Sequence, residues 1–354
     1  MGYYYIPFLI ALIGSISRDK VNKYITVYFV FIFMFLMVVL RGNTSSDYEA
    51  YQNRFSSIAT INLFENFDSF ALLTVFFNNF GLANFRFLLL IFGILTFIPL
   101  FFVLIKNLQY SLICLLYYYS YLFFVQPVSA MKAGVSALIF LLVVLFRAEN
   151  KNKIAFFLFL LAVFFHPTSI VGIFIFSKYF NKNYNILRII ITSVIVFFLG
   201  KYFFSEVISY LANNNLGFIT SKSEGYLEAT ENDIGTRTAN IFLIVISLKF
   251  IFNLSLRYFF KKINYEDNKV RLLLNVQVFA IFIYYFCFSL PVVAARFYEL
   301  IGIVEVITIA FPLLLFKEKK TIQLLIYLLI FFQFYVTVNL LGGEIVKPYY
   351  IYFL

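Results

Sequence analysis

Charged residues are scarce in this chain. They make up 13% of its 354 residues, whereas 63% of the residues are hydrophobic. A soluble domain carries charge on roughly 25% of its residues, so this composition excludes an ordinary soluble fold. Apolar runs of roughly twenty residues recur from end to end, and each is long enough to cross about 30 Å of hydrocarbon. The alternating segments of about ten residues that build outer-membrane barrels are missing. The sequence therefore predicts an all-α, polytopic integral membrane protein.

Cysteine and histidine are also rare, with two cysteines and one histidine. Cys114 and Cys287 lie in separate apolar runs without the spacing of a metal site or a disulfide framework. We expect both to be small buried side chains. The sequence contains no Gly-rich phosphate loop or Walker motif. It therefore predicts no metal, no cofactor and no nucleotide-driven step.

The net charge of +11 comes from basic residues in short loops between the apolar runs. In a soluble protein this excess would suggest nucleic acid as a partner. Here the lysines and arginines are placed to orient helices against the bilayer. The charge pattern therefore indicates contact with membrane lipid and predicts no nucleic-acid partner.

The apolar segments predict a single transmembrane domain over residues 1–354, with about 11–12 transmembrane helices. These segments are 3–17, 24–40, 84–105, 108–125, 130–146, 154–165, 168–180, 187–204, 238–258, 272–290, 296–316 and 321–341. The positive-inside rule places the basic loops 17–23, 147–153, 178–188, 257–271 and 317–320 in the cytoplasm. The two long polar loops, 41–83 and 205–237, then lie on the outer side.

Residues 154–180 are apolar but have basic residues on both flanks. Alternating topology requires this stretch to enter the membrane and return, and the sequence "HPTS" offers the turn. Pro167 breaks a helix because its nitrogen carries no hydrogen. We therefore predict a broken or re-entrant pair of short helices near 154–180, with His166 toward the outer side.

Polar side chains just inside an apolar run cost free energy and usually serve a function. On the predicted outer side they include Arg41, Asp47, Tyr48, Tyr51 and Arg54 after the second run, and Lys132 beside Ala133, Gly134 and Ser136. His166 before Pro167, and Arg296 with Glu299 and Tyr298, complete the set. Arginine forks suit phosphate oxygens, and imidazole suits proton transfer near neutral pH.

Each of these groups also has a purely structural explanation. Arginines at a helix mouth can be interfacial anchors, and small residues beside Lys132 can serve helix packing alone. A lone histidine is often structural. Arg296 and Glu299, three residues apart on one helix face, can form a local ion pair and nothing more.

The order of these motifs resembles the Wzy/EpsG-type polysaccharide polymerases, which include bacterial O-antigen polymerases. Members have a second span ending in "R…DY..Y", an outer helix start with arginine and small residues, then "FH-x-S", "R-x-Y" and a C-terminal "PY". The corresponding residues here are Arg41-Asp47-Tyr48-Tyr51, Lys132-Ala133-Gly134, Phe165-His166-Pro167-Thr168-Ser169, Arg296-Phe297-Tyr298 and Pro348-Tyr349, with Tyr226 in an outer loop. Two positions depart from the family pattern: Lys132 replaces an arginine, and the "FH-x-S" motif has one inserted residue.

The resemblance implies transfer of an undecaprenyl-pyrophosphate-linked glycan onto a lipid-linked repeat unit, at the periplasmic face of the bacterial inner membrane. Under this hypothesis Arg41, Lys132 and Arg296 neutralise the departing pyrophosphate. His166 or Asp47 accepts the proton of the attacking hydroxyl. Tyr48, Tyr51 and Tyr226 position sugars, and the further substrate-binding candidates are Arg54, Tyr298, Glu299 and Tyr349. A chain-length regulator is a possible protein partner.

The main alternative is a flippase or transporter of the same lipid-linked oligosaccharide. That function predicts charged residues along a path through the membrane midplane, whereas the motif residues gather at the outer side. A membrane acyltransferase is a third class, but the chain lacks a histidine–acid pattern for it, and the arginines would have no role.

Overall fold

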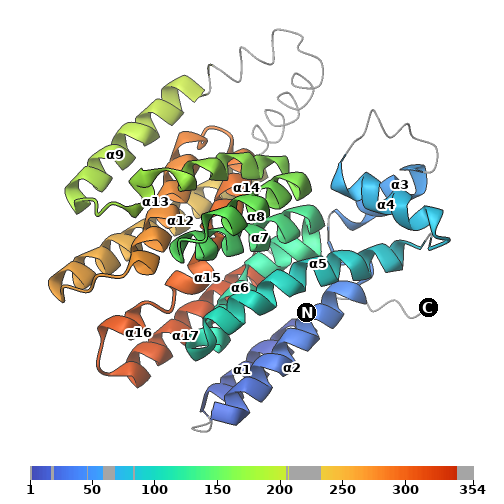
Figure 1. Ribbon diagram of the computed structural model, residues 1–354, viewed down its shortest axis with the longest axis horizontal. Coiled ribbons are helices and arrows are strands. Elements are labelled where there is room, and N and C mark those ends of the chain that lie inside the picture. The colour runs from blue at the N-terminus through green and yellow to red at the C-terminus, as the bar shows by residue number, and fades with distance from the viewer. Residues whose placement is uncertain are drawn as a thin grey trace. The chain divides into compact units, whose positions relative to one another are not determined.

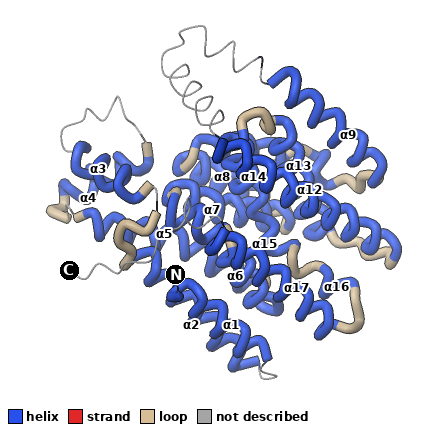
Figure 2. Tube along the Cα trace, turned by 180° about the vertical axis from the view of Figure 1, so that it is seen from behind, coloured by secondary structure: helices blue, strands red, loops and turns tan. Residues whose placement is uncertain are grey.

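The computed structural model describes residues 2–16, 20–45, 47–58, 68–82, 84–204, 206 and 233–340. These residues form helices joined by short loops, and no strand occurs among them (Figures 1 and 2). Eight of the described helices are long and apolar enough to cross a membrane. The protein is therefore an all-α, multi-pass membrane protein, as the composition predicts.

The chain forms two compact units, which are described separately. Unit 1 comprises residues 1–143, 152–170 and 309–354, and unit 2 comprises residues 144–151 and 171–308. The helices of unit 1 are α1 (Ile6–Ile16), α2 (Lys20–Val39), α3 (Tyr48–Ile58), α4 (Ser69–Asn79), α5 (Phe85–Lys106), α6 (Ser111–Ser120), most of α7 (Met131–Ala148), α8 (Asn152–Phe165), α16 (Pro312–Leu315) and α17 (Lys319–Tyr335).

Helix α6 forms the centre of unit 1, because every residue from Ser111 to Ser120 is buried. The hydroxyl of Tyr119 donates to the carbonyl of Tyr4 at 2.7 Å, and its ring stacks on Phe334 of α17 at 5.6 Å. After α6 the chain continues into a π-helical turn, η3 (Phe124–Ser129), which contains Pro127. This turn lies just before α7 and contributes backbone carbonyls to the site described below.

Unit 2 is built around α13 (Asn268–Phe286), which is buried along most of its length. Its other main helices are α9 (Ile186–Leu199), α12 (Asp233–Lys262), α14 (Pro291–Ile301) and α15 (Glu305–Thr308). Asp267 caps α13 by accepting hydrogen bonds from the backbone nitrogens of Lys269 and Val270, which satisfies donors that the first helical turn leaves unpaired.

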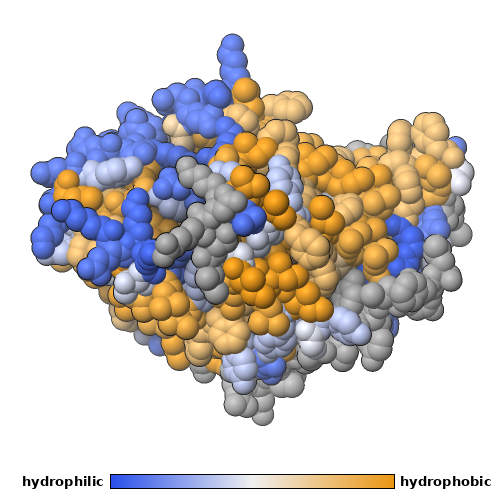
Figure 3. Space-filling model, turned by 90° about the horizontal axis from the view of Figure 1, so that it is seen from below, coloured by the Kyte–Doolittle hydropathy of each residue, from blue (hydrophilic) through white to orange (hydrophobic). Residues whose placement is uncertain are grey.

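Large apolar side chains remain exposed on several outer helices, as the broad hydrophobic surface in Figure 3 illustrates. On α9 they include Ile191, Val194 and Phe198, and on α17 Leu324, Leu328 and Phe332. A soluble monomer rarely exposes such contiguous apolar surface. These faces are suited to contact with lipid.

The predicted break in residues 154–180 is confirmed. Helix α8 ends at Phe165, and a 3-10 helix, η4, covers Pro167–Phe176. The last helical hydrogen bond of α8 runs from the backbone N–H of His166 to the carbonyl of Ala162, at 3.0 Å. Pro167 cannot donate the next hydrogen bond of the helix because it has no N–H.

Two details differ from the sequence-based expectation. Four of the twelve expected segments form helices that are shorter than a full membrane span: 3–17, 108–125, 154–165 and 168–180. The other eight segments correspond to the eight long helices. The predicted outer loop 41–83 contains two helices, α3 and α4, of 11 residues each. A search for runs of roughly twenty apolar residues passes over helices of this length. The second predicted outer loop, 205–237, lies almost entirely outside the described residues.

Candidate active site

Two cationic side chains from separate helices of unit 1 meet at the carboxylate of Asp68. Its Oδ2 accepts hydrogen bonds from Arg54 Nη1 of α3 at 2.8 Å and from Lys132 Nζ of α7 at 2.6 Å. Its Oδ1 accepts the backbone N–H of Ala71 at 2.9 Å and so caps α4. All three side chains are partly exposed, Lys132 by 20% and Arg54 by 31%. We call Arg54, Asp68 and Lys132 the Asp68 cluster.

The Asp68 cluster carries an excess of positive charge, because two cations share one carboxylate. Burial by itself would raise the pKa of Asp68, but hydrogen bonds from Lys132, the Ala71 nitrogen and Arg54 outweigh it and lower this pKa below its ordinary value. At a pH above about 3.9, the pKa of an aspartate in the unfolded chain, the lowered pKa of Asp68 stabilises the folded state. This contribution is lost as the pH falls through the pKa of Asp68 in the folded protein. The carboxylate of Asp68 is therefore charged at neutral pH.

A hydrogen bond between residues adjacent in sequence connects His166 to the Asp68 cluster. Ser69, which follows Asp68, donates its hydroxyl to the carbonyl of Phe165, which precedes His166, at 3.3 Å. His166 is half-buried, and its Nδ1 shares a hydrogen bond of 2.6 Å with Thr168 Oγ1. This bond fixes the orientation of the imidazole ring.

Hydrogen bonds of α7 fix the position of Lys132 relative to the broken segment around His166. Ser136, one turn after Lys132, donates to the carbonyl of Ala162 at 2.7 Å and shares a hydrogen bond of 2.5 Å with Ser169. Both partners flank the break at His166. The break therefore gives Lys132 and His166 fixed positions at the same end of unit 1.

Arg41 is fully buried beneath this region. Its Nη1 donates to the carbonyls of Pro127 and Val128 in η3, and its own carbonyl accepts a bond of 3.1 Å from Arg86 Nη1. Arg41 thus lies at the helix mouth where the sequence predicts it, with its guanidinium against the backbone of η3. A substitution of Arg41 would remove a buried charge and these contacts, so Lys132 is the more informative residue to change.

Gly134 allows α7 to approach η3 closely, which the small residues beside Lys132 predict. A Cβ at this position would lie 2.9 Å from the backbone nitrogen of Pro127 and 3.1 Å from its Cα. Backbone atoms cannot move aside as a flexible side chain can. The short distance therefore fixes the first turn of α7 against the segment that binds Arg41.

We expect Gly134→Ala to destabilise the protein by about 1–3 kcal/mol, the usual range for overpacking a tight contact. The added methyl group must push α7 away from η3 and shift Lys132 with it. Thermal unfolding in detergent should show the loss. Gly2→Ala, at a glycine with no atom within 4 Å of an added Cβ, is the control, and equal stability of the two variants would refute the close contact.

The predicted sugar-binding tyrosines of α3 pack against aromatic side chains. Tyr48 is buried, and its ring meets Phe85 edge-on at 5.4 Å, whereas Tyr51 contacts Phe70 at 5.2 Å. The guanidinium of Arg54 also lies over Phe70, at 5.4 Å from the ring centre. These contacts hold α3 on α4 and α5. They show a positioning function for Tyr48 and Tyr51, and their contact with sugar stays a prediction.

Arg296 and Glu299 of unit 2 form the expected local pair, with Nη1 and Oε2 3.8 Å apart. Tyr298 is buried and donates its hydroxyl to Glu305. The roles of these residues toward a ligand stay predictions, as does that of Asp47, whose carbonyl accepts the backbone N–H of Tyr51 at 3.0 Å. Tyr226 and Tyr349 lie outside the described residues.

A buried polar network crosses the helices of unit 2. Glu305 Oε2 pairs with Lys249 Nζ at 2.6 Å, and Glu305 Oε1 accepts from Gln277 at 3.4 Å. Gln277 in turn accepts a bond of 2.8 Å from Asn253, which accepts one from Arg257 at 2.8 Å. Lys249 also lies 5.0 Å from the Tyr298 ring centre.

Sequence reasoning missed both Asp68 and this network, although each left a signal. Asp68 immediately precedes an apolar run, the usual position of a helix N-cap. Lys249 and Glu305 are charges inside the apolar segments 238–258 and 296–316. The network also shows that charge is not confined to the helix ends, so the sequence-based argument against a flippase loses its force.

Comparison with known proteins identifies the family. No curated protein and no solved structure is significantly similar to this chain. The family model described as the EpsG family matches residues 24–352, nearly the whole chain and all residues of the Asp68 cluster. The chain belongs to the EpsG family.

Proposed function

We propose that this protein is a polysaccharide polymerase of the bacterial inner membrane. It would transfer a glycan from undecaprenyl pyrophosphate to the nonreducing end of a lipid-linked repeat unit, on the outer side of the membrane. Membership of the EpsG family supports a polymerase-like glycosyltransferase. O-antigen or a related surface polysaccharide is the proposed product.

The observation that carries this proposal is the meeting of Arg54, Asp68 and Lys132 beside His166. Its two cations carry more positive charge than Asp68 alone can balance, and this excess suits the oxygens of a pyrophosphate. Oxygens of the substrate would compete with the Asp68 carboxylate for Arg54 and Lys132. Within unit 1, Lys20 and Lys23 lie at the start of α2, and Arg41 follows its other end, which agrees with an outward-facing position.

In the proposed reaction, the hydroxyl oxygen of the acceptor sugar attacks the anomeric carbon of the donor. The bond from that carbon to the pyrophosphate oxygen breaks, and its electron pair leaves with the pyrophosphate. Lys132 and Arg54 neutralise the charge that develops there. The imidazole of His166 takes the hydroxyl proton. The low pKa of Asp68 makes it a weaker base at neutral pH, which favours His166 for this step.

A deletion strain distinguishes the polymerase from the flippase. We expect lipid-linked single repeat units to accumulate on the outer side of the membrane, where they can be labelled in intact cells, and long polymer to be absent. The gene supplied on a plasmid should restore polymer. Repeat units trapped on the cytoplasmic side would contradict the proposal and favour the flippase.

A further inference from the structure

Unit 2 contains a pocket of about 260 Å³ that has no part in the proposed polymerase site. The short 3-10 helix η5 (Lys178–Asn181), the linker after it, α9 and α13 form its walls. The polar lining residues are Tyr179, Tyr184, Arg188, Thr192 and Asn275. Phe279 and Phe282 of α13 line the rest together with aliphatic side chains.

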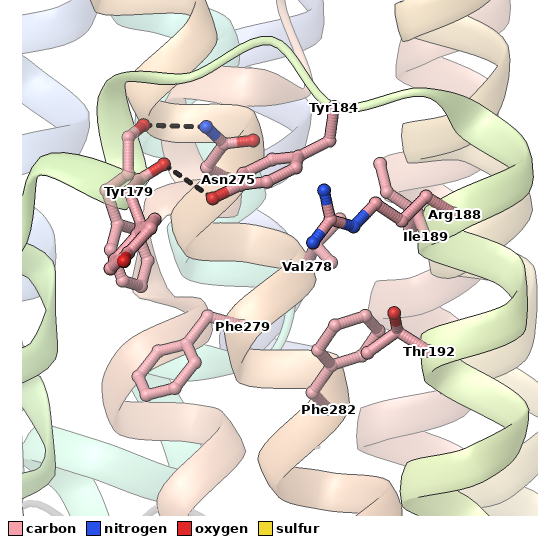
Figure 4. A pocket seen from close by; sticks show the side chains of 10 residues that line it. Tyr179, Tyr184, Arg188, Ile189, Thr192, Asn275, Val278, Phe279 and Phe282 are labelled. Carbon is pink, nitrogen blue, oxygen red and sulfur yellow. Dashed lines mark hydrogen bonds between the residues drawn. The ribbon is translucent and has the colours of Figure 1, made fainter.

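Arg188, Tyr184 and Asn275 form the polar end of this pocket, and Phe282 lies at the other end beside Thr192. In Figure 4 the guanidinium of Arg188 points into the space between α9 and α13, toward Tyr184 and Asn275, while Phe279 and Phe282 lie farther along α13. The Arg188 guanidinium is 5.8 Å from the Tyr184 ring centre. The Tyr184 hydroxyl donates to the carbonyl of Tyr179 at 2.9 Å, and Asn275 donates to those of Phe180 and Lys182. The polar end is therefore held by a fixed set of hydrogen bonds.

Among the described residues, Arg188 is the charged residue in the lining of this pocket. No lining residue is acidic. Lys182 lies 4.9 Å from the Tyr179 ring centre, and Arg271 donates to the carbonyl of Asn181 at 3.1 Å. An anionic group in the pocket would therefore meet the cation of Arg188 and no carboxylate among the described lining residues. The loop 178–188 is one of the basic loops that the positive-inside rule places in the cytoplasm.

We propose that this pocket binds an anionic phospholipid of the cytoplasmic leaflet. The lipid phosphate pairs with Arg188, and the first part of one acyl chain lies along Phe279 and Phe282. The volume fits this portion of a lipid, and it is smaller than the roughly 300–1,000 Å³ of pockets that enclose a whole drug-sized ligand. A lipid bound there would join α9 to α13.

The test uses the full-length protein, purified in detergent and freed of lipid, with short-chain phosphatidylglycerol as the probe. Binding is measured by native mass spectrometry and by the shift of the thermal unfolding temperature. We expect Arg188→Gln to weaken binding about tenfold to a hundredfold, as the loss of a charge-assisted hydrogen bond predicts. Lys201→Gln is the matched control, because Lys201 follows the same helix α9 and lies 5.6 Å from the ring centre of Tyr202. It should bind as the unchanged protein does.

A second variant, Phe282→Ser, keeps the cation and makes the apolar end polar, and it should also weaken binding. Equal losses in Arg188→Gln and Lys201→Gln would overturn the proposal, because they would indicate attraction by charge alone. Phosphatidylcholine of the same chain length bound as tightly as phosphatidylglycerol would overturn it too. Tighter binding of polyprenyl phosphate would assign the pocket to the carrier lipid and refute the phospholipid assignment.

Discussion

Lys132→Ala is expected to abolish long-chain polymer while the protein remains folded in the membrane. Lys132 contributes one of the two cations proposed to neutralise the leaving pyrophosphate, and removing one such group typically costs about 10²–10³-fold in rate. Asp68 would still accept hydrogen bonds from Arg54 and from the Ala71 nitrogen. The carboxylate is therefore not left unpaired, and α4 keeps its cap.

The measurement is the length distribution of the polymer in a deletion strain that expresses each variant at equal protein level. Lys132→Arg should retain part of the activity, because it keeps the charge and restores the residue type usual in the family. Lys151→Ala is the matched control, since Lys151 forms an ion pair of 2.8 Å with Glu149 at an exposed turn. Normal polymer in Lys132→Ala would remove this lysine from the proposed site.

Lys249→Met is expected to destabilise the protein by about 3–5 kcal/mol, the cost of leaving one partner of a buried ion pair without the other. The side chain of Glu305 is only 5% exposed, so water cannot replace the lost ammonium group. The double variant Lys249→Met/Glu305→Gln should recover most of the stability. It removes both charges, and the glutamine carbonyl can still accept the hydroxyl of Tyr298.

Thermal unfolding in detergent is measured for the unchanged protein, the two single variants and the double variant, which together give a double-mutant cycle. A strongly non-additive cycle is expected because the two groups lie 2.6 Å apart. Glu149→Gln, which breaks an exposed ion pair, should change stability by less than about 1 kcal/mol. If the losses of the two single variants simply add, the buried pair does not stabilise unit 2.

The candidate site was only partly predictable from sequence. The motifs predicted Arg54, Lys132 and His166 as separate candidates, and the structure brings them together in unit 1 through Asp68 and Ser69. Asp68 was missed because an acid at the start of a short helix looks like an ordinary cap. The guanidinium of Arg41 contacts the carbonyls of Pro127 and Val128, and its role toward a ligand stays a prediction.

The sequence by itself determined that the chain crosses a membrane and where its long helices lie. The reason is that a bilayer demands long apolar runs, and a run of this kind has few alternatives to a helix. It also determined the break at Pro167, since the loss of a backbone donor is a local property. Only the tertiary structure decided that Asp68 joins Arg54 to Lys132 and that Lys249 meets Glu305. Such pairs lie far apart in the chain, and their contact depends on how helices pack, which no local pattern of hydrophobicity or charge records.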